Sequence, residues 1–192
     1  KFEEGPKPIY KTLRYADHAL KLFFDKASKM PWFANTMFVI TADHASAEIM
    51  YEPYNTAWGY FAIPVFFYHS GWTDTGMRPE IIQQIDIMPT VLGYLNYDEP
   101  YLAFGRNVFD PKTKPFAFNY LNNAYQLFEG PYLLLFDGAR TTGLYNYQED
   151  KLLARNVLAN SPTIAHDMER RLKAFIQHYN NRMVDNRLTV PR

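Results

Sequence analysis

The stretch Thr-Met-Phe-Val-Ile-Thr-Ala-Asp-His, residues 36–44, sets the expectation for the fold. Its first seven residues are a short apolar run rich in β-forming side chains, which predicts a strand. Residues 9–30 carry apolar side chains three and four positions apart, which predicts a helix that Pro31 ends. A helix followed by a buried strand is typical of a layered α/β domain.

Further elements follow on the C-terminal side of this stretch. A second buried strand is predicted at residues 63–68, and a helix at 81–95 that breaks or begins at Pro89. Strands at 116–121 and 143–147 flank a predicted antiparallel hairpin, 125–128 with 132–136, that turns at Glu129 and Gly130. Ser161 is a good N-cap for a last helix that begins at Pro162 and runs to about residue 183.

These elements predict an α/β fold with a layered mixed sheet flanked by helices, followed by a C-terminal antiparallel hairpin and helix. Within residues 1–192 we expect an α/β core over 1–110 and the C-terminal strands and helix over 111–192. That length suits one domain and is sufficient to bury a core.

The composition excludes several classes of function. Lys and Arg together number 20, as do Asp and Glu, so the basic excess of a nucleic-acid-binding protein is lacking. The sequence has no Cys, which excludes disulfides, Cys-ligated zinc and a Cys nucleophile within these residues. No apolar run approaches the roughly 20 residues of a membrane span. The aromatic share is 17%, which fits either an aromatic core or contacts to saccharides and lipid headgroups.

Asp43 and His44 are the main candidate site residues, because they directly follow the predicted strand. In open α/β sheets ligands bind beyond the carboxyl ends of strands. A carboxylate oxygen and an imidazole nitrogen are suitable ligands for a divalent metal. The alternative is structural, with Asp43 capping a turn and His44 bonding a backbone carbonyl. His69 ends the second predicted strand and is a candidate substrate-binding residue.

Several short motifs, taken in order, carry a resemblance to a known family. They lie at residues 15–17, 35–36, 41–44, 63–65, 84–92, 143–150 and 154–158. Together they are similar to the sulfatase branch of the alkaline phosphatase superfamily, and they spread over most of the chain. The resemblance therefore implies an incomplete alkaline phosphatase-like domain that corresponds to the C-terminal portion of the family's catalytic domain.

The resemblance also implies a mechanism and a division of the active site. In this family a Thr, or a formylglycine made from Cys or Ser, attacks phosphorus or sulfur beside a divalent metal. Carried over, Asp43 and His44 are two metal ligands, and the metal is Mn, Mg, Ca or Zn. The family's nucleophile and other acidic ligands precede the Asp-His pair, whereas only 42 residues do so here. We therefore expect no nucleophile in this chain and no turnover by it alone.

Two departures from the family pattern narrow the resemblance. Ala45 replaces the usual Gly, and residues 45–62 lack the Lys or Arg that arylsulfatases place in this loop to bind sulfate. Residues 58–64 and 68–71 look more like the lipoteichoic acid synthase group of phosphoglycerol transferases. Those enzymes are membrane-anchored and act outside the cytoplasm, so the resemblance implies an extracytoplasmic cell-envelope location and an anchor N-terminal to these residues.

The expected substrates are phosphate esters of envelope lipids or glycans. A sulfate-ester hydrolase and a non-catalytic envelope binding module that keeps the fold remain alternatives. The parent's upstream strands would cover one side of the strands at 37–42 and 63–68. We therefore expect self-association of this chain, or an exposed apolar face near those strands.

Overall fold

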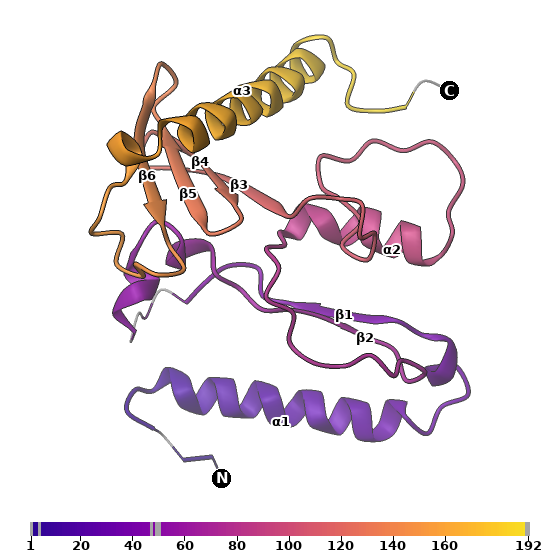
Figure 1. Cartoon of the computed structure of the whole chain (residues 1–192). Coiled ribbons are helices and arrows are strands. Elements are labelled where there is room, and N and C mark those ends of the chain that lie inside the picture. The colour runs from indigo at the N-terminus through magenta and orange to yellow at the C-terminus, as the bar shows by residue number, and fades with distance from the viewer. Residues whose placement is uncertain (1, 4, 47, 49–50, 191–192) are drawn as a thin grey trace. The chain divides into compact units, whose positions relative to one another are not determined.

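The computed structural model describes residues 2–3, 5–46, 48 and 51–190 (Figure 1). The chain divides into two compact units. The first contains Lys1–Ala42 and Pro64–Met77, and the second contains Asp43–Ile63 and Arg78–Arg192. The chain therefore passes between the units directly after the predicted strand and again directly before the next one. The expected division at residue 110 stays a prediction.

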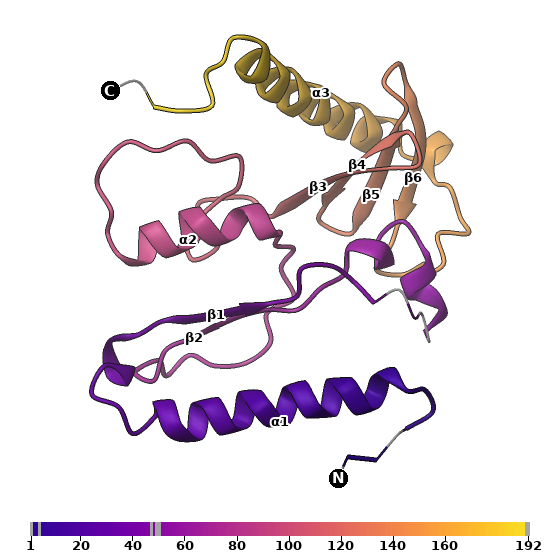
Figure 2. The same ribbon diagram turned by 180° about the vertical axis from the view of Figure 1, so that it is seen from behind.

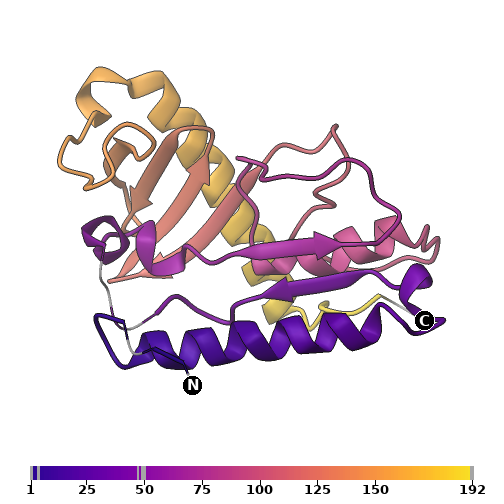
Figure 3. The same ribbon diagram turned by 90° about the horizontal axis from the view of Figure 1, so that it is seen from below.

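The first unit packs one long helix beside a two-stranded sheet (Figure 3). Helix α1 spans Ile9–Ala27, strand β1 spans Phe38–Thr41, and strand β2 spans Val65–Tyr68. The two strands are antiparallel, with Phe38 opposite Tyr68. All three predicted elements are present, and α1 ends three residues earlier than its apolar periodicity suggested.

Aromatic rings hold α1 against the sheet. The ring of Phe24 lies 5.0 Å from that of Phe38 and 5.6 Å from that of Tyr68, and Phe33 completes the cluster at 5.3 Å from Phe38. The expectation that β1 and β2 are buried was wrong. Each strand has a single neighbour and keeps partial exposure, and the Phe66 side chain is 58% exposed.

The second unit contains a four-stranded antiparallel sheet in the order β3-β4-β5-β6. The strands span Phe116–Leu121, Ala124–Glu129, Tyr132–Phe136 and Thr141–Asn146. Helix α3, Pro162–Val184, lies across one face, as Figures 1 and 2 show from opposite sides. Their shared core consists of Leu127, Leu134, Phe136, Leu144, Ala165, Met168 and Leu172.

Two tight turns fix the register of this sheet. Asn122 and Asn123, both with positive φ, join β3 to β4, and positive φ at both positions suits a type I′ hairpin. Gly130, with φ +54°, opens the turn from β4 to β5, where a side chain would be strained. The predicted strands and hairpin are therefore confirmed.

Helix α2 spans Ile87–Tyr94 and follows a 3₁₀ turn over Gln84–Asp86. Pro89 lies in its first turn, so the predicted helix start near this residue is confirmed. Ser161 does occupy the N-cap of α3, but its side chain makes no capping hydrogen bond there, contrary to expectation. Its backbone carbonyl accepts the Ala165 N–H instead.

The α/β class, the antiparallel C-terminal strands and the final helix agree with the predicted fold. The described strands pair only in antiparallel fashion and form two separate sheets. One sheet is the β1–β2 pair, and the other consists of strands that are consecutive in the sequence, β3 to β6. Across the described part of the chain, every helix is too short or too polar to cross a membrane.

Candidate metal centre

Asp43 and His44 lie directly beyond the end of β1 and point into solvent. Their side chains are 88% and 77% exposed, respectively, and neither is part of a helix. The Oδ2 atom of Asp43 and the Nε2 atom of His44 lie 3.6 Å apart. The two side chains that the sequence singled out are therefore neighbours with their polar tips together.

Local hydrogen bonds orient both side chains. The Nδ1–H of His44 donates to the carbonyl oxygen of Ala45 over 2.8 Å, and the His44 backbone N–H donates to Oδ1 of Asp43 over 3.0 Å. Both features of the structural alternative, the turn cap and the carbonyl bond, are thus present. They leave Nε2 and Oδ2 as the atoms that face each other. Because a carbonyl only accepts, neutral His44 carries its proton on Nδ1 and has a lone pair on Nε2.

This arrangement suits two ligands of one metal ion. A carboxylate oxygen and a neutral imidazole nitrogen 3.6 Å apart could both be held by one divalent ion. A metal-bound His commonly donates its other ring N–H to a backbone carbonyl, as His44 does. Among the described residues, no group of three or more His, Cys, Asp or Glu side chains gathers to hold a metal.

The backbone of Asp43 is braced from the start of α2. The side-chain Nε2–H of Gln84 donates to the Asp43 carbonyl over 2.9 Å. Gln84 begins the 3₁₀ turn that ends at Asp86, so the position of the metal-ligand candidate depends on the stability of that turn.

Asp86 is the buried centre of this support. Its side chain accepts the Gln83 N–H on Oδ2 over 3.0 Å and the Arg106 N–H on Oδ1 over 2.8 Å, and the first of these bonds is part of a capping box at the 3₁₀ turn. Its backbone carbonyl accepts the Thr90 hydroxyl over 2.6 Å. Burial raises the pKa of Asp86, against the opposing effects of the two N–H donors and the Arg106 charge.

His69 belongs to the first unit, whereas Asp43 and His44 belong to the second. Its Nδ1 atom accepts the backbone N–H of Gly71 over 3.0 Å, so this ring nitrogen caps the turn after β2. A substrate-binding role for His69 stays a prediction.

A basic side chain reaches the loop that lacks Lys and Arg in its sequence. Lys151 lies after β6, and its Nζ atom is 5.3 Å from the centre of the Trp58 ring and 5.8 Å from that of Tyr147. The Trp58 Nε1–H donates to the Lys151 carbonyl over 2.9 Å. Sequence reasoning missed this cation because 93 residues separate it from Trp58 and no local pattern joins them.

Comparisons with known proteins show a partial match to one sequence family and a likeness in fold. The sequence model of the Sulfatase family matches residues 7–97. No curated protein matches this sequence. Among solved structures, a protein in the alkaline phosphatase superfamily from Vibrio parahaemolyticus is similar over 100% of this chain, with 20% identity and a TM-score of 0.76. Ps i-CgsB, solved in complex with k-i-k-neocarrahexaose, is similar over 90% of this chain, with 15% identity and a TM-score of 0.67.

The fold is therefore that of the alkaline phosphatase superfamily. Residues 7–97, just under half of the chain, match the sequence model of the Sulfatase family, the branch of that superfamily that the motifs predicted. The chain spans 45% and 44% of the lengths of the two solved chains.

Proposed function

We propose that this chain supplies Asp43 and His44 as two ligands of a divalent metal in an enzyme that transfers or hydrolyses phosphate esters, in the manner of phosphoglycerol transferases. The observation that carries the proposal is the Nε2–Oδ2 pair, 3.6 Å apart and exposed, with the His44 proton directed to a carbonyl. The match of residues 7–97 to the Sulfatase family model supports the proposal, since Asp-His pairs ligate metal in that family.

Each residue would have a distinct part in that site. A bound metal would supply Lewis acidity and neutralise charge on the ester oxygens. Asp43 contributes a negative charge and His44 a neutral nitrogen, and Gln84 holds the Asp43 backbone in place. The nucleophile and the remaining ligands would come from a part of the protein upstream of Asp43.

Sulfate-ester hydrolysis is the second candidate. Two observations favour it. The Sulfatase sequence model matches residues 7–97, and the amine of Lys151 lies beside Trp58, where a cation could bind a sulfate oxygen. The phosphoglycerol transferase proposal includes an envelope location, an N-terminal anchor and a lipid or glycan acceptor. These three features are proposed only together with that reaction. A longer protein that contains this chain, assayed on aryl sulfates and on glycerophosphate-headed lipids, separates the two reactions.

A manganese titration followed by NMR tests the metal centre itself. Mn²⁺ should broaden the amide signals of residues 42–46 first, and the double variant Asp43→Asn/His44→Gln should abolish that broadening. His166 and Asp167 are a matched control, because they are adjacent on α3 and helical neighbours point in different directions. Equal broadening at the helical pair, or unchanged broadening in the double variant, would overturn the proposed metal ligands.

A further inference from the structure

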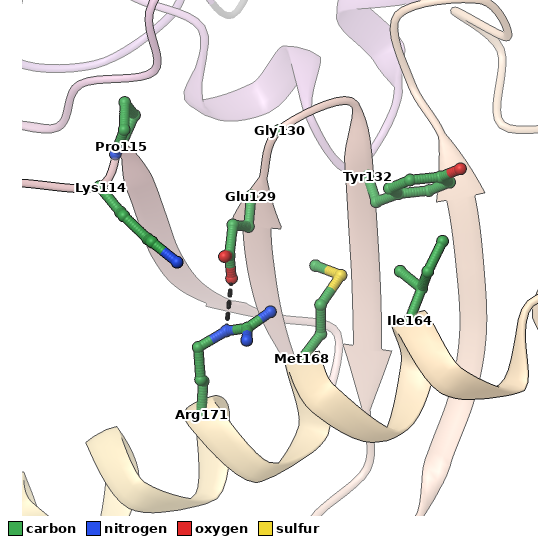
Figure 4. Close-up of a pocket in the computed structure, with 8 residues that line it drawn as sticks. All are labelled: Lys114, Pro115, Glu129, Gly130, Tyr132, Ile164, Met168 and Arg171. Atoms are coloured by element: carbon green, nitrogen blue, oxygen red, sulfur yellow. Dashed lines mark hydrogen bonds and ion pairs between the residues drawn. The ribbon is translucent and has the colours of Figure 1, made fainter.

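A groove in the second unit lies between α3 and the end of the C-terminal sheet at which β4 turns into β5. Neither Asp43 nor His44 lines it. Figure 4 shows it. It has a volume of about 340 Å³, within the range of small-molecule sites. Its walls come from Lys114, Pro115, Glu129, Gly130, Tyr132, Ile164, Met168 and Arg171.

Three charged side chains meet at one end of this groove. Arg171 on α3 donates its Nε–H to Oε2 of Glu129 on β4 over 2.7 Å. Lys114, just before β3, directs its amine toward the same carboxylate in Figure 4 without forming an ion pair with any described residue. The lining therefore carries two positive charges and one negative charge.

The donors at this end exceed the acceptors. Arg171 uses Nε for Glu129, and its two terminal nitrogens form no hydrogen bond within the described residues. The Lys114 amine adds three more donors. An anionic group that lies between Lys114 and Arg171 would satisfy donors that Glu129 leaves open, and the net charge of the lining favours a single negative charge.

The other end of the groove is apolar. The ring of Tyr132 lies beside Ile164 in Figure 4, and Met168 lies between this end and Arg171. Pro115 lies at the charged end, beside Lys114. Met168 is buried, so it forms the floor that joins the groove to the core. A ligand that fills both ends has a charged group and an apolar body.

We propose that this groove binds an organic monoanion, with its charged group between Lys114 and Arg171 and its apolar body on Tyr132, Ile164 and Met168. The chemical class includes a sulfate monoester, a carboxylate and a phosphodiester. Binding here does not need the metal, so the proposal stands independently of the proposed reaction.

Calorimetric titration with phenyl sulfate in the presence of EDTA tests the groove without a metal at Asp43 and His44. We expect saturable binding that added salt weakens, with weaker binding of inorganic sulfate, which lacks the apolar body, and of anisole, which lacks the charge. Absence of saturable binding, or equal affinity for anisole, would overturn the proposal.

Variants with opposite expected signs locate the binding. Lys114→Met should lower affinity about fivefold or more, since it removes a charge-assisted contact at a partly exposed site. Glu129→Gln should raise affinity, because it removes the competing negative charge. Lys112→Met is the matched control and should leave affinity unchanged, since Lys112 lies two residues away and outside the lining.

The unfolding temperature of each variant is measured alongside, so that a loss of affinity is counted only for a folded protein. Wild-type affinity in folded Lys114→Met, or a fall in affinity in folded Glu129→Gln, contradicts the charge arrangement. If Lys114→Met does not fold, a charge-preserving comparison of Lys114→Arg with Lys114→Gln gives the same contrast.

Discussion

Replacing Asp86 with Ala should destabilise the second unit strongly, because this carboxylate is the acceptor for two backbone donors. The side chain is only 1% exposed, and it receives the N–H groups of Gln83 and Arg106. After the substitution, the Arg106 donor is buried without an acceptor and the Gln83 donor is partly buried without one. A buried donor left unsatisfied costs about 1–3 kcal/mol.

Two such donors give a gross cost of about 2–6 kcal/mol. Removal of the carboxylate also removes its own burial penalty, which is the reason its pKa is raised, so the net loss belongs in the lower half of that range. We expect a loss of about 2–3 kcal/mol in the free energy of unfolding, measured by urea denaturation followed by circular dichroism.

Asp137→Ala is the matched control for burial. Asp137 also accepts two backbone N–H groups, from Ala139 and Arg140, each over 2.8 Å, but it is exposed in a turn. Water can replace its acceptor oxygens, so its loss should be distinctly smaller. A wild-type urea midpoint for Asp86→Ala, or equal losses at the two positions, would refute the reasoning from buried donors.

Three further outcomes are expected. The hydrogen bond from Lys173, and after it that from Thr141, lowers the pKa of Glu169. The stabilising contribution of Glu169 is therefore present above its ordinary pKa and is lost as pH falls through the folded pKa. Urea midpoints of Glu169→Gln should decline less on acidification than those of the wild type. This chain alone should give background rates on aryl phosphates, aryl sulfates and glycerophosphate-headed lipids, and robust turnover abolished by Asp43→Ala would show a complete site. Light scattering across a concentration series should show self-association, because the β1–β2 face exposes apolar side chains such as Phe66. A strictly monomeric species would contradict the idea that this face drives association.

Local patterns predicted the secondary structure well. The strand at residues 116–121 has the predicted bounds, and the apolar stripe of the last helix does supply Met168 and Leu172 to the core. These features succeed because alternation and helical periodicity are properties of neighbouring residues. The degree of burial of β1 was not predictable in the same way, since an apolar run does not say how many neighbours a strand has.

The contacts that shape both sites join distant residues. Gln84 reaches Asp43 across 41 positions, and Arg171 reaches Glu129 across 42. Neither pair has a spacing that a local pattern could reveal. The sequence therefore singled out Asp43 and His44 as candidates, and their metal-binding role stays a prediction, while the structure was needed to find the contacts around the pair and the charged groove.

In the proposed metal centre, the exposure of Asp43 and His44 limits how tightly this chain would hold an ion. Two protein ligands are fewer than a divalent metal site normally has, and no third metal-binding side chain joins them among the described residues. Metal bound by the pair alone would therefore be held weakly. Local contacts nevertheless restrain the pair, since the Ala45 carbonyl accepts the His44 Nδ1–H and the Gln84 side chain donates to the Asp43 carbonyl. Ligands restrained in this way lose little conformational freedom when a metal and further ligands bind. We infer that this chain supplies two pre-arranged ligands and that the further ligands would supply most of the affinity for the metal.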